Sequence, residues 1–138
     1  MNSPVTIDAS VFVSAFTPSE PAHKVSKAFM LGIREQTIPI IVPVLVLPEI
    51  SAALSRGQGK PELGKAFVQE LKNFPNTTFV SVDSTLADLA VDIAAEHRLR
   101  GSDAVYAAVA LRFGTELITL DKEQLERLPK VLSVRNPS

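Results

Sequence analysis

Residues 102–121, SDAVYAAVALRFGTELITLD, place a helix, a turn and a strand in immediate succession. Ser102 belongs to the residue types that cap the start of a helix, and Gly114 to those that end one. The run at 116–120 has the short, apolar character of a strand buried in a sheet. Asp121 follows this strand and is expected to open a short helix. A helix that leads directly into a buried strand is typical of folds in which the two alternate.

The same alternation extends over the rest of the chain. Further strands are expected at 4–8, 38–42 and 77–81, with an edge strand at 131–134. Further helices are expected at 21–34, at 48–56 with a stop at Gly57, from Pro61 to just before Pro75, and from 83 or 84 to 97. No long Gly/Ser/Pro stretch or internal repeat divides the chain, so residues 1–138 are expected to form one domain. The predicted fold is α/β, with a mostly parallel central sheet of four to five strands flanked by helices.

The composition limits the classes of function. With 46% hydrophobic and 21% charged residues, the chain should fold around a core. It has no cysteine, which excludes a disulfide framework, thiolate metal ligands and a cysteine nucleophile. The net charge of −1 argues against binding nucleic acid over the whole surface, but leaves room for a local basic rim.

The apolar segments are too short or too interrupted for export or membrane insertion. Asp8 divides the N-terminal apolar residues, so the pattern of a signal peptide is missing. The longest apolar run, at 38–47, contains two prolines and is about half the roughly 20 residues that a membrane-spanning helix needs. The sequence therefore predicts a soluble, cytoplasmic protein with no membrane partner.

Four acidic residues are expected to meet at one edge of the sheet. Asp8 and Asp121 each follow a predicted strand, while Glu49 and Asp103 lie near the starts of helices. In a parallel sheet, the carboxyl ends of strands and the helices that follow them share an edge. Singly, each acid could be a cap or turn residue. Together, four carboxylates would repel one another unless a cation neutralised them.

This set of ligands predicts the kind of metal and the kind of reaction. Oxygen ligands alone select hard ions such as Mg²⁺ or Mn²⁺. A hydrated ion of this kind suits the hydrolysis of a phosphodiester, because it activates water and stabilises the leaving oxygen. Outside the four acids the chain is mildly basic, which is compatible with RNA or DNA binding.

Basic residues near the predicted site could contact RNA phosphates. Arg56 lies seven residues after Glu49, on nearly the same helix face, and Arg100 lies close to Asp103. A solvated surface arginine explains Arg56 equally well. Weaker candidates for the same rim are Lys60, Arg98 and Arg112.

Four segments, taken in order, resemble the successive motifs of PIN domains, specifically those of VapC-type toxins. They are TIDASVFV at 6–13, LPEISAAL at 47–54, LRGSDAVYAAVA at 99–110 and LITLD at 117–121, and they cover essentially the whole chain. The resemblance implies that Asp8, Glu49, Asp103 and Asp121 form an acidic metal site supported by the hydroxyls of Ser10 and Thr119.

The resemblance also implies an activity and partners. It implies a Mg²⁺- or Mn²⁺-dependent endoribonuclease that acts on RNA as a homodimer. It further implies inhibition by a VapB-type antitoxin whose tail enters the active-site groove. An apolar helix face, such as that with Leu63, Phe67 and Leu71, is wide enough for a twofold contact.

Several alternatives remain beside this interpretation. His23 and His97 could cleave RNA through its 2′-hydroxyl, but nothing in their spacing brings them together, and His97 lies on an apolar stripe. An aspartate-nucleophile phosphatase would need an acid where Ser10 stands, and a phosphoreceiver domain would need an adjacent acidic pair near the N-terminus. Other PIN domains process RNA, or bind RNA or protein without catalysis.

A helix face with Asp88, Asp92 and Glu96 is a separate acidic feature. These residues recur at every fourth position, so they share one side of their helix. We expect a solvated face, partly offset by Arg100, with a second metal site as a remote alternative.

Overall fold

Short aliphatic and β-branched runs form the five strands of one sheet in this computed structural model, which describes residues 3–138. The strands are β1 (Val5–Ile7), β2 (Ile40–Pro43), β3 (Thr77–Val80), β4 (Glu116–Ile118) and β5 (Val134–Arg135). Their order is β3-β2-β1-β4-β5, and every neighbouring pair is parallel. All three residues of the central β1 are buried, as expected when helices cover both faces of a sheet. The predicted α/β class is confirmed.

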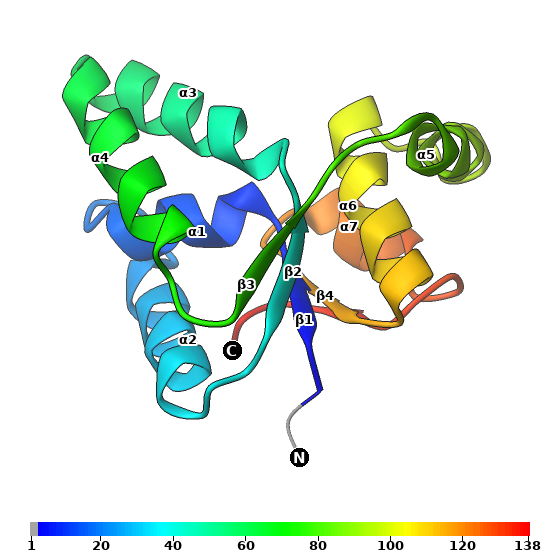
Figure 1. Ribbon diagram of the computed structural model, residues 1–138, viewed down its shortest axis with the longest axis horizontal. Helices are drawn as coiled ribbons and strands as arrows, with labels where there is room; N and C mark the ends of the chain where they lie inside the picture. Colours follow the sequence, from blue (N-terminus) through cyan, green and yellow to red (C-terminus); the bar gives the residue numbers. More distant parts are fainter. Residues whose placement is uncertain (1–2) are drawn as a thin grey trace.

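Helices cover the sheet on its two sides. They are α1 (Ala9–Phe16), α2 (His23–Glu35), α3 (Val46–Gln58), α4 (Pro61–Lys72), α5 (Ser84–His97), α6 (Gly101–Phe113) and α7 (Lys122–Arg127). Figure 1 shows α1 to α4 on one side of the strands and α5 to α7 on the other. Within residues 3–138, no helix combines the length and the apolar character that crossing a bilayer requires.

Small residues bring α6 close to the middle of the sheet. Ala104, Ala107, Ala108 and Ala110 are almost completely buried, and α6 contacts β1, β2 and β4. Side chains of this size let the helix axis approach the strands closely, which fixes the start of α6 beside the carboxyl ends of β1 and β4. Asp103 lies in that first turn of α6.

The structure corrects four details of the sequence interpretation. The helix α1 was not predicted, although Asp8 caps it by accepting a hydrogen bond from the Ser10 N–H. The helix α3 continues through Gly57 and ends at Gly59, because Gly59 adopts the left-handed conformation (φ 65°) that favours glycine. Arg100, rather than Ser102, precedes the first turn of α6. The edge strand β5 lies at Val134–Arg135, three residues beyond the predicted start.

Candidate functional site

A cavity of about 680 Å³ opens at the carboxyl edge of the sheet, between α1, α3 and α6. It is lined by the four predicted acids, Asp8, Glu49, Asp103 and Asp121, and by Ser10, Arg56 and Arg100. These residues come from four distant parts of the sequence. The structure therefore places all four carboxylates, Arg56 and Arg100 around one space, while Thr119 lies buried behind it. The weaker candidates Lys60, Arg98 and Arg112 do not line this cavity.

Asp8 is held in a fixed orientation at the base of this cavity. Its Oδ1 accepts a hydrogen bond from the Ser10 N–H at 2.5 Å. Its Oδ2 accepts from the Thr119 hydroxyl at 2.6 Å and from the Gln124 side-chain amide at 2.8 Å. Only 5% of Asp8 is exposed, so these three donors replace water around a buried carboxylate.

Ser10 and Thr119 support the loop after β4, as well as the acids. The Ser10 hydroxyl accepts a hydrogen bond from the Leu120 N–H at 3.1 Å, and the Thr119 hydroxyl oxygen accepts one from the Asp121 N–H at 3.0 Å. Thr119 thereby connects Asp8 with the backbone of Asp121. Both hydroxyls hold the chain where it leaves the sheet, which explains why β4 ends at Ile118 rather than Leu120.

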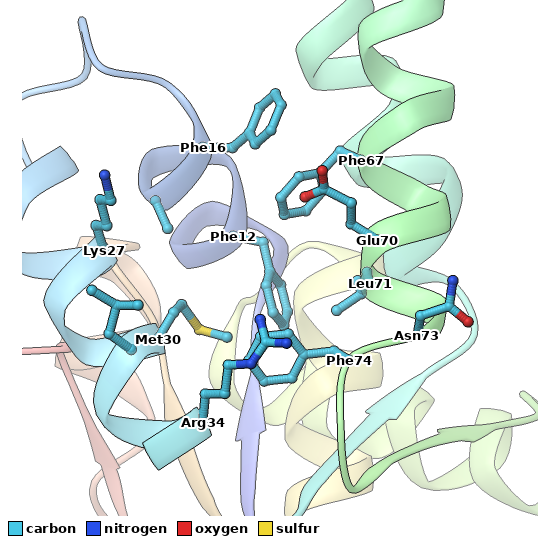
Figure 2. A pocket seen from close by; sticks show the side chains of 12 residues that line it. Phe12, Phe16, Lys27, Met30, Arg34, Phe67, Glu70, Leu71, Asn73 and Phe74 are labelled. Atoms are coloured by element: carbon cyan, nitrogen blue, oxygen red, sulfur yellow. The ribbon is translucent and has the colours of Figure 1, made fainter.

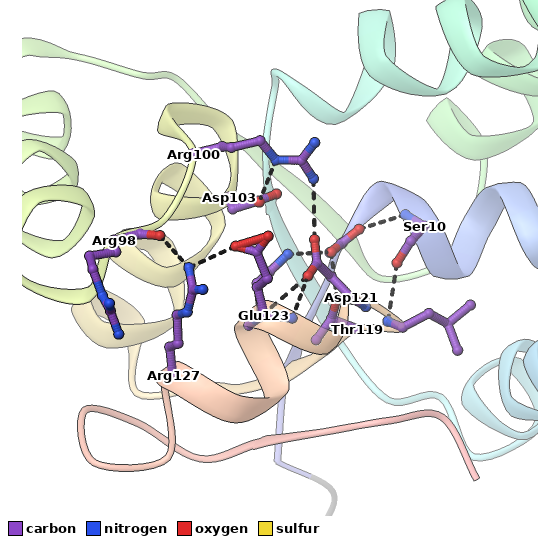
Figure 3. Close-up of polar contacts among 11 residues, drawn as sticks. Ser10, Arg98, Arg100, Asp103, Thr119, Asp121, Glu123 and Arg127 are labelled. Atoms are coloured by element: carbon purple, nitrogen blue, oxygen red, sulfur yellow. Dashed lines mark hydrogen bonds and ion pairs between the residues drawn. The ribbon is translucent and has the colours of Figure 1, made fainter.

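Arg100 bridges two of the acids, as Figure 3 shows. Its Nε lies 3.2 Å from Asp103 Oδ2, and one terminal guanidinium nitrogen lies 3.2 Å from Asp121 Oδ2. Burial nevertheless raises the pKa of Asp103 to about 6, and the nearby guanidinium opposes this shift. Arg100 therefore neutralises part of the negative charge of the cavity, instead of offsetting the acidic face of α5 as expected.

Glu49 is positioned by Tyr106 across the cavity. The Tyr106 hydroxyl donates a hydrogen bond of 2.5 Å to Glu49 Oε1. Burial, together with the Glu49 carboxylate, raises the pKa of Tyr106, so the phenol stays protonated and remains a donor. Tyr106 and Glu49 lie 57 residues apart in the chain, and no motif in the sequence links them.

The set of oxygen donors fits a hydrated Mg²⁺ or Mn²⁺ ion. Within residues 3–138, no three carboxylate or imidazole side chains lie close enough together to surround a metal ion directly. Mg²⁺, however, usually keeps several waters and uses only one or two protein carboxylates as direct ligands. Carboxylates that line the same cavity can bind such an ion through its waters. A hard, oxygen-preferring cation is therefore the kind of ion whose ligand preferences these donors match.

The remaining residues singled out in the sequence lie away from the cavity. His23 Nδ1 is 2.9 Å from the carbonyl oxygen of Ser14, and His97 lies beside Glu96 on α5. Neither histidine lines the cavity that holds the acids. The acidic face of α5 is exposed, as predicted.

A second, apolar groove lies between α1, α2 and α4, and its lining is shown in Figure 2. It has a volume of about 550 Å³ and is lined by Phe12, Phe16, Phe67 and Phe74. Phe16 and Phe67 pack with ring centroids 4.6 Å apart. Lys27, Arg34 and Glu70 also line it, so the groove combines an aromatic floor with two basic side chains and one acidic side chain.

This groove changes the interpretation of α4. Leu71 is only 2% exposed, and Phe67 is half-buried against α1. The face with Leu63, Phe67 and Leu71 thus packs largely inside the molecule, and only its border with the groove is accessible.

Comparisons with known proteins agree with this architecture. One curated relative, ribonuclease VapC3 of Pyrobaculum aerophilum, is 22% identical over 94% of this chain and 98% of its own length. The solved structure of Mycobacterium tuberculosis VapC20 is described as that of a toxin that cleaves the sarcin-ricin loop. It matches this chain with a TM-score of 0.73 at 16% identity, and the match covers 86% of this chain and 90% of that one. DNA-bound VapBC from Salmonella typhimurium matches with a TM-score of 0.71 at 16% identity, over the full length of both chains.

At these identities, the solved structures establish the fold alone. A match to the family model covers nearly the whole chain: residues 5–131 fit the PIN domain. This span begins with β1 and includes the four acidic residues around the cavity. The chain therefore belongs to the PIN domain family.

Proposed function

We propose that this protein is a Mg²⁺- or Mn²⁺-dependent endoribonuclease of the cytoplasm and the toxin of a VapBC-type toxin–antitoxin pair. In this proposal, residues 1–138 form a single nuclease domain. The observation that carries it is the convergence of Asp8, Glu49, Asp103 and Asp121 on one cavity at the carboxyl edge of a parallel sheet. The names of the relatives add support, since one is a ribonuclease and another a toxin that cleaves an RNA loop.

The four acids would hold the divalent cation, and the surrounding residues would hold the acids. When bound, the cation lowers the pKa of the attacking water and stabilises negative charge on the leaving oxygen. Thr119 and Ser10 fix the orientation of Asp8, while Tyr106 fixes Glu49. Preorganised ligands of this kind need little rearrangement when the substrate arrives.

Two guanidinium groups at the cavity are suited to bind the RNA backbone. Arg56 lines the wall formed by α3, and 75% of the Arg100 side chain is exposed at the opposite wall. Arginine binds phosphate oxygens through paired N–H groups. We assign both residues to phosphate binding, and Arg100 would release Asp103 and Asp121 to the cation as it turns to the phosphate.

Analysis of the cleavage products tests the proposed reaction. When an activated water attacks phosphorus and the 3′-oxygen departs, the products carry a 5′-phosphate and a 3′-hydroxyl, and the RNA 2′-hydroxyl takes no part. We therefore expect these end groups in mass spectra of an oligonucleotide digested with Mg²⁺ or Mn²⁺, and no cleavage in excess EDTA. An RNA with a 2′-deoxynucleotide at the cleaved position should still be cut.

The alternatives predict different products. A 2′,3′-cyclic phosphate as the primary product would contradict the mechanism and favour attack by the 2′-hydroxyl. RNA binding without cleavage at any metal concentration would instead indicate a non-catalytic PIN module. Specific maturation of one host RNA, without growth inhibition on overexpression, would indicate an RNA-processing nuclease.

We further propose that the protein forms a homodimer and binds a VapB-type antitoxin. Several structurally similar proteins were solved as toxin–antitoxin complexes. The apolar groove between α1, α2 and α4 suits an amphipathic antitoxin segment: its aromatic floor would accept apolar side chains, and Lys27 and Arg34 would pair with acidic ones. The antitoxin tail would then extend to the carboxylate cavity.

A charge placed at the groove should prevent antitoxin binding without affecting the nuclease. Leu31 lines the groove and is 51% exposed, so Leu31→Glu should abolish co-purification of the antitoxin encoded beside this gene, yet leave RNA cleavage unchanged. Val91→Glu is the matched control, since Val91 is 63% exposed on α5. Retention of antitoxin by Leu31→Glu would contradict this docking site.

Light scattering of the protein without antitoxin tests the proposed homodimer. The measured mass should be about 30 kDa, the mass of two 14.9 kDa chains, and a strict monomer would contradict the dimer.

A further inference from the structure

Gln124 is a fully buried polar residue beside the cavity that no motif accounts for. It lies on α7 with 0% of its surface exposed, and its amide nitrogen donates to Asp8 Oδ2 at 2.8 Å. Its carbonyl oxygen Oε1 is also buried and has no hydrogen-bond partner among residues 3–138. The reverse orientation of the amide would place this oxygen against the carboxylate, so the repulsion between them decides which atom faces Asp8.

The position of Gln124 is unfavourable for stability. A buried carbonyl without a hydrogen-bond partner destabilises the folded protein relative to the unfolded chain, in which water hydrates it. An apolar side chain of the same size would avoid that cost at a site surrounded by the protein core. The amide does, however, donate a hydrogen bond to Asp8, which an apolar side chain could not do.

This contact determines which oxygen of Asp8 remains available. Each carboxylate oxygen has about two lone-pair sites. Oδ2 accepts two hydrogen bonds, from Thr119 and Gln124, whereas within the described part of the chain Oδ1 accepts one, from the Ser10 N–H. Oδ1 is therefore the oxygen of Asp8 that can still bind a ligand from the cavity.

We propose that Gln124 is a positioning residue that occupies Oδ2 of Asp8 and thereby reserves Oδ1 for the cation. This inference rests on the proposed function, because it assumes that the cavity holds Mg²⁺ or Mn²⁺. Without Gln124, Oδ2 would accept a hydrogen bond from Thr119 alone and would keep one lone-pair site free. Gln124 fills that site from a different element, α7, and adds a third restraint to those of Thr119 and the Ser10 N–H.

Replacement of Gln124 by methionine tests this role. Met has nearly the same length but no amide, so Gln124→Met removes the donor and the unpaired carbonyl together. We expect the dissociation constant for Mn²⁺, measured by isothermal titration calorimetry without RNA, to rise about 10-fold or more, as for other residues that orient metal ligands. The melting temperature of the metal-free protein should stay the same or rise.

Leu128→Met is the matched control. Leu128 is fully buried at the end of α7 and makes no hydrogen bond to Asp8 through its side chain, so its replacement perturbs packing alone. It should leave the Mn²⁺ affinity unchanged. If Gln124→Met is insoluble, Gln124→Leu provides the same comparison.

The possible results separate this inference from the proposed function. Unchanged Mn²⁺ affinity in Gln124→Met, or an equal loss in Leu128→Met, would overturn the positioning role while the metal site stands. Absence of Mn²⁺ binding by the wild-type protein would overturn the proposed function, and this inference with it.

Discussion

Replacing Asp103 with asparagine is expected to lower the rate of RNA cleavage more than about 100-fold without unfolding the protein. A catalytic cation contributes several kcal/mol of charge stabilisation in the transition state, and each 1.36 kcal/mol corresponds to about a factor of ten. Asp103 is only 9% exposed, and burial raises its pKa to about 6. Removing this buried charge stabilises the folded protein, whereas losing the ion pair with the exposed Arg100 destabilises it. These two effects oppose each other, so the melting temperature should change little.

The pH dependence of cation binding provides a second readout for the same residue. Because the pKa of Asp103 is raised, its carboxyl group becomes neutral as the pH falls through about 6, and the neutral form binds cations poorly. Mn²⁺ affinity of the wild-type protein should therefore fall over that range. The Asp103→Asn protein should have weak affinity throughout and lose this step, because its amide does not titrate.

Asp88→Asn is the control for both measurements. Asp88 is an exposed acid on α5 and does not line the cavity, so its replacement removes the same charge elsewhere. Cleavage by Asp103→Asn at the rate of Asp88→Asn would refute the assignment of Asp103 to the site. An Mn²⁺ affinity of the wild-type protein that stays constant as the pH falls through about 6 would also refute this assignment.

The order of strands and helices could be predicted because each element carries its own periodicity. The apolar stripe of α5, the end of α6 at Gly114 and the start of α7 at Asp121 each depend on residues within a few positions of one another. The helix α1 escaped prediction because its sequence, ASVFVSAF, is apolar on most sides and contains β-branched residues. Such a run cannot be assigned from periodicity alone, and only the capping role of Asp8 distinguishes it.

The acids of the candidate site could be placed from the sequence, but their partners could not. Parallel strands share a carboxyl edge, so any acid that follows a strand is brought to that edge. Gln124 lies three residues after Asp121, a spacing that from sequence indicates only the start of a helix. Its contact with Asp8 spans 116 residues of the chain and depends on how α7 packs. The link from Tyr106 to Glu49 depends likewise on the distance between α6 and α3.

The close approach of α3 and α4 gives the largest stability change that we predict. A Cβ atom at Gly64 would lie 2.6 Å from the backbone oxygen of Ser51 and 2.6 Å from the hydroxyl of Ser55. Because a backbone atom of α3 is involved, the two helices would have to separate. Overpacking of this kind costs about 1–3 kcal/mol, occasionally more, so we expect Gly64→Ala to lower the free energy of unfolding by about that amount in urea titrations.

Gly57 supplies a control of opposite sign on the neighbouring helix. A Cβ at Gly57 would have no atom within 4 Å, and the residue lies inside α3. Gly57→Ala should therefore raise the free energy of unfolding by about 0.5–1 kcal/mol, because alanine loses less backbone entropy than glycine when a helix forms. Equal stability of the two variants would contradict the tight crossing at Gly64.

The separation of the helices should also affect RNA cleavage, because α3 carries Glu49 and Arg56. Gly64→Ala should cleave RNA more slowly than the wild type at temperatures where the variant is still folded. Gly57→Ala should cleave RNA like the wild type.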